Sequence, residues 1–140
     1  MNKIEIVPYD KLRPEAMEWY SNPGIQKNVN GIEMPYSREQ IQKMYDYQRT
    51  HGELYYIEYN GKTVGDASTF DDEYAIVVAP EAQGKGIGSI VTEYFVSLAR
   101  LRGDKEFKVE IHDYNEPSKK MFARLGFENS EGNSYKKLLV

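Results

Sequence analysis

The sequence predicts one α+β domain built around a mixed, mostly antiparallel sheet of six or seven strands, with about four helices packed against it. Three observations predict this class. Strand and helix patterns follow one another in the order β-α-α-β-β-β-α-β-α-β, an Asn-Gly pair separates two adjacent strand patterns, and one strand–helix–strand unit needs a crossover. The chain has 140 residues without internal repeats or linkers, so we expect a single domain over residues 1–140.

The N-terminal part contains one strand and two helices. Residues 3–9 alternate apolar and polar side chains, as a half-buried strand does. Pro14 opens a helix, and Asn22-Pro23-Gly24 is expected to end it. Ser37 and Gln40 have the spacing of a capping box, which starts the second helix.

Three strands follow in the middle of the chain. Residues 53–59 and 62–70 are joined at Asn60-Gly61, a pair that favours a hairpin because both turn positions need positive φ. The next strand spans residues 73–80. Its run Ala75–Ala79 has no polar alternation, which predicts burial on both faces at the centre of the sheet.

The C-terminal part alternates helices and strands. A helix with an apolar stripe starts at residue 87 and ends before Gly103, and a strand over residues 107–114 is expected to run parallel to the preceding strand. A short helix over 116–126 and a strand over 134–140 close the chain. This last strand either pairs with a second copy or closes its own sheet, so we expect a monomer or a homodimer.

Composition excludes several classes of function. The net charge of −4 disfavours nucleic-acid binding and suits a cationic ligand or simple solubility equally. No apolar run is long enough to span a bilayer, and the N-terminus does not resemble a signal peptide, so we expect a cytoplasmic protein without a membrane partner. The chain has no cysteine, hence no thiolate nucleophile or thiolate metal site, and we expect no metal.

The tract Gln83-Gly84-Lys85-Gly86-Ile87-Gly88-Ser89 lies between a buried strand and a long helix. Alternating glycines allow positive φ, so successive N–H groups converge on one point at a positive helix end. This arrangement favours a phosphate site. The alternative is that the glycines only permit a tight turn and close helix packing. No Walker string is present, and Ser89 stands where a dinucleotide fingerprint has its third glycine.

The tract and its surroundings resemble the GCN5-related N-acetyltransferase (GNAT) family. Gln83-x-x-Gly86-x-Gly88 after Val-Val-Ala-Pro is similar to that family's pyrophosphate loop, and Ile111-x-x-x-Asn115-x-x-Ser118 with Leu125-Gly126-Phe127 is similar to its downstream segment. The first fifty residues look like the branch that includes ribosomal-protein N-terminal and aminoglycoside acetyltransferases.

The resemblance implies acetyl-CoA as co-substrate and a wedge between the splayed strands 74–80 and 107–114. Coenzyme A would then contact Val77 and Val78 by their backbone, and also Gln83, Gly84, Lys85, Gly86, Ile87, Gly88, Ser89, Asn115, Ser118 and Phe122. Asn115 also suits a helix cap, and both roles are compatible.

The chemistry that the resemblance implies is direct acetyl transfer from the thioester to a primary amine. The N–H of Val78 is a candidate donor to the oxyanion of the transition state. The family often places a proton-donating tyrosine four residues after Ser118, but this chain has Phe122 there. Tyr114, Tyr135 or water are the alternatives as proton donor.

Asp72 and Glu73 are the candidate general bases, because many family members present a carboxylate near the start of this strand. The alternative is a solvated acidic turn. Histidine as a residue type titrates near neutral pH, which makes His112 a further candidate base, but a lone histidine on a strand is more often structural. Glu33 and Asp66 are candidates to receive a cationic substrate.

Three functions are therefore compared. The first is an N-acetyltransferase whose acceptor is a small-molecule amine or a peptide N-terminus. The second is a GNAT-like module that binds coenzyme A without turnover, which the absence of the tyrosine favours, and the third is a nucleotide-binding domain. Residues 19–36 are expected to set acceptor specificity.

Overall fold

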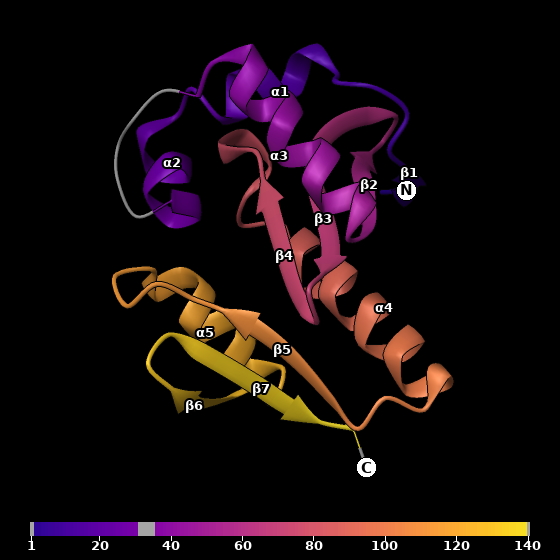
Figure 1. Ribbon diagram of the computed structural model, residues 1–140, viewed down its shortest axis with the longest axis vertical. Coiled ribbons are helices and arrows are strands. Elements are labelled where there is room, and N and C mark those ends of the chain that lie inside the picture. The colour runs from indigo at the N-terminus through magenta and orange to yellow at the C-terminus, as the bar shows by residue number, and fades with distance from the viewer. Residues whose placement is uncertain (1, 31–35, 140) are drawn as a thin grey trace.

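The computed structural model describes residues 2–30 and 36–139. It shows one seven-stranded sheet in the order β1-β2-β3-β4-β5-β7-β6, with β4 and β5 as its parallel pair (Figure 1). The strands are β1 Ile4–Pro8, β2 Gly52–Tyr59, β3 Lys62–Phe70, β4 Glu73–Val78, β5 Glu106–Glu110, β6 Glu128–Glu131 and β7 Ser134–Leu138. The helices are α1 Pro14–Trp19, α2 Pro23–Asn30, α3 Arg38–Thr50, α4 Ile87–Arg102 and α5 Glu116–Arg124, with a short 3-10 turn at Pro80–Ala82. The predicted fold class is confirmed.

Two hydrophobic clusters cover opposite faces of the sheet. On one face, α4 and α5 pack against β2–β5 through a cluster that includes Tyr74, Val91, Phe95 and Phe122. We call this the α4 face. On the other, which we call the α3 face, α1 and α3 pack through residues that include Trp19, Tyr20, Ile41, Tyr45 and Tyr56. The sheet therefore separates two environments that meet only across its strands.

Both tight turns of the β2–β3–β4 meander use left-handed backbone. Asn60 (φ 52°) and Gly61 (φ 82°) form the predicted β2–β3 hairpin turn. Asp71 (φ 52°) and Asp72 (φ 62°) form a second turn between β3 and β4. Aspartate tolerates this region better than most side chains do, so the acidic pair has a structural role in the turn.

The helix that Pro14 opens ends at Trp19, before Asn22-Pro23-Gly24, but the structure adds a helix that the sequence did not predict. The same residues begin α2: the Asn22 side chain accepts a hydrogen bond from the Ile25 N–H at 3.1 Å, and Pro23 occupies the first helical position. Proline suits that position because its N–H is not needed there.

The C-terminal strand lies inside its own sheet. β7 pairs with β5 on one side and with β6, which the sequence did not predict, on the other. Of the two alternatives for the last strand, closure of its own sheet is the one that β7 shows, since both edges of the described strand are used. Strand β5 also ends at Glu110, earlier than predicted, and residues 111–115 form a loop.

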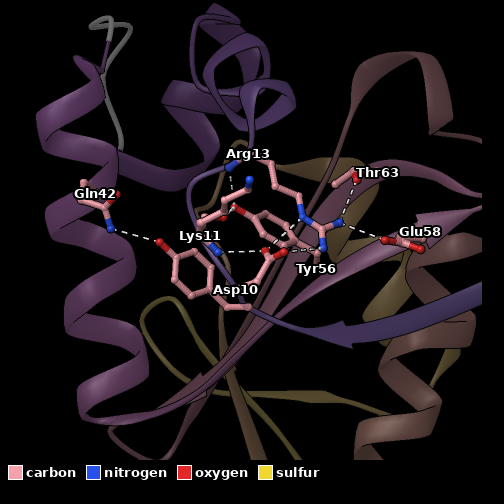
Figure 2. A network of polar contacts seen from close by, with 8 residues as sticks. Asp10, Lys11, Arg13, Gln42, Tyr56, Glu58 and Thr63 are labelled. Atoms are coloured by element: carbon pink, nitrogen blue, oxygen red, sulfur yellow. Dashed lines mark hydrogen bonds and ion pairs between the residues drawn. The ribbon is translucent and has the colours of Figure 1, made fainter.

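A polar network fixes the connection between β1 and α1 (Figure 2). Arg13 donates to Asp10, to Glu58 at 2.9 Å and to Thr63 at 3.0 Å, and its guanidinium lies 4.5 Å from the Tyr56 ring centroid. The Tyr56 hydroxyl accepts from the Arg13 N–H and donates to the Lys11 carbonyl. The network thereby holds the start of α1 on the β2–β3 hairpin.

Candidate functional site

The glycine loop leads from β4 into α4 through two residues with positive φ. Gly84 has φ 80° and Gly86 has φ 79°, and a Cβ added at either would meet no other group within 4 Å. The backbone conformation therefore demands glycine, while the space beside the loop is open. Any side chain placed there would project into that space.

No side-chain hydrogen bond caps the N-terminus of α4. Its cap is Gly86, which has no side chain to accept a hydrogen bond, and the first turn contains no acidic residue. The N–H groups of Ile87, Gly88 and Ser89 thus point out of a positive helix end, and the exposed Lys85 stands beside them. This geometry fits an anion.

Gly88 has a packing role in addition. A Cβ there would lie 3.1 Å from the Met121 Sδ on α5, so the start of α4 approaches α5 closely. The Ile87 side chain is buried in the core of the α4 face. The tract thus combines two features: Gly84 and Gly86 shape the open loop that suits an anion, and Gly88 allows close packing against α5.

Strands β4 and β5 separate along their length. Their ladder has a single pair, Tyr74 with Val109, near the start of β4. Beyond it the two strands diverge, as the arrows in Figure 1 show. The second half of β4 therefore has a ladder partner on one side, β3, and faces a widening gap on the other.

The register of β3 and β4 decides which backbone groups face this gap. Gly65 is opposite Val78, and the Ala79 N–H donates to the Val64 carbonyl at 2.7 Å. In an antiparallel ladder the hydrogen-bonded residues alternate, so Val77 is bonded to Asp66 on β3. The backbone groups of Ile76 and Val78 point the other way, toward β5.

This register corrects the expectation that Val77 offers its backbone to a ligand. The residue that faces the gap together with Val78 is Ile76, which was not among the residues predicted to contact a ligand. The period of two along a strand identifies Ile76 once Val78 is assigned. The Val77 side chain instead packs on the α3 face.

Gln83 ties the loop to the strand. Its Nε2 donates to the Val78 carbonyl at 2.9 Å. The Val78 carbonyl, which faces away from β3, thus accepts a hydrogen bond from a side chain of the glycine loop. This contact fixes the position of the loop relative to the second half of β4. The Val78 N–H lies on the same side of the strand, beside this contact.

Asp72 and Glu73 lie at the closed end of the gap. Both are exposed, at or next to the β3–β4 turn. Asp72 is six residues from Val78, which corresponds to about 20 Å along an extended strand. Burial and the neighbouring Glu110 raise the pKa of Glu73. The structure therefore does not bring these carboxylates together with Val78.

Tyr114 lies in the loop after β5, and its hydroxyl donates to the Lys27 carbonyl of α2. The Lys27 Nζ is 4.7 Å from the centroid of the Tyr114 ring. The His112 ring lies parallel to the Tyr114 ring, with the two centroids 5.4 Å apart. Tyr114 thus links α2 to the far side of the gap, and its hydroxyl proton is directed at a backbone carbonyl. Glu33 lies outside the described residues.

The residues at the start of α5 act first as a cap. The Asn115 side chain accepts from the Ser118 N–H at 3.4 Å. Phe122 is 2% exposed and packs against Phe127 with ring centroids 5.0 Å apart. It is a core residue on the α4 face, so the structure shows no surface through which Phe122 would contact a ligand.

A hollow of about 450 Å³ lies elsewhere, at the closed end of the β4–β5 pair. It is lined by the β3–β4 turn, the start of β5 and the α4–β5 connection. It shares no residue with the glycine loop, and its charged lining is of mixed sign and largely exposed. We therefore place the candidate site at the open end of the gap, because the β3–β4 register and the N-terminus of α4 both point there.

The described part of the chain was also searched for metal sites and for membrane-spanning helices. Within residues 2–30 and 36–139, no group of three or more His, Asp or Glu side chains has the arrangement of a metal site. No helix in those ranges is long and apolar enough to cross a membrane.

A helix end that suits an anion lies beside the open edge of a splayed parallel pair, and together they suit a phosphate-bearing ligand with an extended arm. Comparison with known families identifies the class of protein. The model of the acetyltransferase (GNAT) family matches residues 12–127, and the chain belongs to this family of acetyltransferases. No match is found among curated protein sequences.

Solved structures share the fold over nearly the whole chain. An N-acetyltransferase from Staphylococcus aureus is 20% identical, with a TM-score of 0.71 over 99% of both chains. A GNAT family acetyltransferase from Elizabethkingia anophelis with acetyl-CoA bound is 18% identical, with a TM-score of 0.68 over 97% of this chain and 98% of that one. The ribosomal-protein-S18-alanine N-acetyltransferase from Escherichia coli is 19% identical, with a TM-score of 0.67 over 99% of this chain and 94% of that one.

Proposed function

We propose that the protein transfers an acetyl group from acetyl-CoA directly to a primary amine of a small molecule or a peptide N-terminus. The observation that carries this proposal is the junction of the glycine loop with β4. A helix end fit for a diphosphate stands next to outward-facing strand backbone, and the Gln83 side chain holds the two together. Membership of the acetyltransferase family and the acetyl-CoA bound to the Elizabethkingia relative support the choice of ligand.

The residues divide the binding of acetyl-CoA between them. The N–H groups from Gly84 to Ser89 would bind the pyrophosphate, with Lys85 adding a positive charge. The backbone of Ile76 and Val78 would pair with the amides of the pantetheine arm, as an added strand pairs with a sheet edge.

Catalysis would need little from side chains. The amine nitrogen attacks the thioester carbonyl carbon, the C–S bond breaks, and coenzyme A leaves as a thiolate while the nitrogen loses a proton to solvent. The Val78 N–H, or that of Ile76, would donate to the carbonyl oxygen as it gains negative charge. A thiol ionises at a pKa near 8.5, so a thiolate leaves readily without a strong acid beside it.

The carboxylates named from the sequence take no contact role in this scheme. Asp72 and Glu73 stand too far from Val78 to touch the amine, and we assign proton removal to water. Tyr114 would serve as a proton donor only after giving up its bond to the Lys27 carbonyl.

One observation favours a second candidate function. Phe122, which replaces the tyrosine expected from the family resemblance, is buried in the core and offers no hydroxyl. A module that binds coenzyme A without turnover would tolerate this arrangement.

The test combines binding and turnover. The protein is incubated with acetyl-CoA and a panel of primary amines while free thiol is followed, and acetyl-CoA melting shifts are measured in parallel. We expect a melting shift and amine-dependent thiol release. A shift without release on any amine supports the binding module, and no shift refutes both functions.

A further inference from the structure

A carboxylate is buried on the α3 face, one strand away from the gap. Asp66 on β3 is 2% exposed, and its Oδ2 accepts hydrogen bonds from the hydroxyls of Tyr20 and Tyr45, each at 2.7 Å. No described group donates a hydrogen bond to its other oxygen, Oδ1. A further donor can therefore be added without breaking either tyrosine bond.

No basic side chain of the chain neutralises Asp66. None of the ion pairs within residues 2–30 and 36–139 includes it, and residues 31–35 contain no Lys, Arg or His in the sequence. Burial raises the pKa of Asp66 to about 6, against the partial compensation of the two hydroxyls. A buried charge without a counter-charge costs stability, and such groups gather at functional sites.

The same face also buries a hydroxyl that has no hydrogen-bond partner among the described residues. Ser68 lies two residues along β3 from Asp66 and is 0% exposed. Its Oγ has no hydrogen-bond partner in the described structure. The α3 face thus buries more hydrogen-bonding capacity than its own side chains use.

The position of Asp66 connects it with the acceptor. Asp66 is paired with Val77, so both side chains lie on the α3 face, whereas the glycine loop leads into α4 on the opposite face. A thioester whose pyrophosphate is held at α4 and whose arm enters the gap would present its acetyl group toward the α3 face. Asp66 stands about 10 Å from the middle of the gap, which is two strand spacings.

We propose that Asp66 is a specificity-determining residue that pairs with a second positive charge on the acceptor, so that the protein prefers diamines over monoamines. This inference rests on the proposed function. The reacting nitrogen must be neutral to attack the thioester, so it is not the charge that Asp66 pairs with. A second ammonium on a short chain spans the separation between the gap and the carboxylate and supplies the missing counter-charge.

The test compares two products of acetyl transfer, N-acetylputrescine and N-butylacetamide. They have the same carbon chain and a neutral acetylated nitrogen, so they differ only in the second ammonium. Binding of each to the protein saturated with coenzyme A is measured by calorimetry at pH 7, which needs no turnover. We expect N-acetylputrescine to bind at least tenfold more tightly than N-butylacetamide. In Asp66→Asn, which keeps an acceptor for both tyrosine hydroxyls, we expect the two amides to bind equally.

The control variant is Glu39→Gln, which removes one negative charge from the exposed first turn of α3. We expect it to retain the preference for N-acetylputrescine. Equal binding of the two amides by the wild type overturns the inference without any variant, as does an unchanged preference in Asp66→Asn. Thiol release is recorded separately with putrescine and n-butylamine: equal release with both amines refutes the role of Asp66 alone, whereas a preference in binding without release from either amine refutes only the proposed turnover.

Discussion

The sharpest prediction concerns Gly86→Asp and its matched control, Gly103→Asp. The two glycines cap opposite ends of α4, have φ of 79° and 87°, and leave room for a Cβ. Both variants therefore carry a similar conformational penalty of roughly 1–2 kcal/mol. The helix dipole makes the new charge favourable at the N-terminus and unfavourable at the C-terminus, by about 0.5 kcal/mol each.

We therefore expect the two variants to rank differently in the two measurements: Gly103→Asp is at least as harmful to stability, whereas Gly86→Asp is more harmful to acetyl-CoA binding. Gly103→Asp should lower the melting temperature at least as much as Gly86→Asp does. Only Gly86→Asp places a negative charge against the pyrophosphate, at a cost of about 4 kcal/mol for two charges 4 Å apart near a protein surface. That is a loss of affinity for acetyl-CoA of between a hundredfold and a thousandfold.

The assay is acetyl-CoA binding by calorimetry, with thermal unfolding of both variants without ligand. If Gly86→Asp binds acetyl-CoA as the wild type does, the assignment of the glycine loop to the pyrophosphate is refuted. The same conclusion follows if both variants lose affinity equally, because the loss would then reflect damage to α4 as a whole.

Three further predictions follow from other contacts. Gln83→Ala removes the donor to the Val78 carbonyl and should weaken acetyl-CoA binding about tenfold with little change in melting temperature. A large fall in melting temperature together with the loss of affinity would contradict this prediction. The free energy of unfolding of the wild type should fall by about 3 kcal/mol as the pH rises from about 4 to above 6, because native Asp66 has a raised pKa and binds its proton more tightly than unfolded Asp66 does. Urea titrations of Asp66→Asn should lack this component, and identical pH profiles would refute the assignment. Arg13→Ala leaves Glu58 without its donor and should cost roughly 2 kcal/mol of stability in urea titrations while acetyl-CoA affinity is unchanged.

Local sequence signals predicted the elements whose geometry is decided locally. Asn60-Gly61 requires positive φ at both turn positions, and the Ser37 and Gln40 side chains form both bonds of the capping box. The glycine tract likewise gave the positive φ of Gly84 and Gly86, because few other residues adopt that conformation.

The elements that were missed depend on context or lack a pattern. Asn22-Pro23 suits both the end of one helix and the start of the next, and only packing shows that α2 follows α1 directly. Strand β6 is exposed along its whole length, so it has no apolar alternation to reveal it. Its pairing with β7 alone defines it.

Within the site, the sequence predicted the loop better than the strand beside it. Whether Val77 or its neighbours face the gap depends on the register with β3, which is set by tertiary pairing. The role of Asp72 was overestimated because closeness in sequence to β4 does not show which end of the strand is open. Asp66 was named as a possible receiver of positive charge, but its isolation from every basic side chain became visible only in the structure.

The central claim is that acetyl-CoA binds along the second half of β4 and at the start of α4. Amide chemical shifts measured during an acetyl-CoA titration test it most directly. We expect the amides of Ile76, Val78 and Gly84–Ser89 to shift together, while that of Asp72, at the closed end of the gap, stays in place. Shifts confined to Asp71–Glu73 and the adjoining hollow, with the Gly86 and Val78 amides unmoved, would contradict the account.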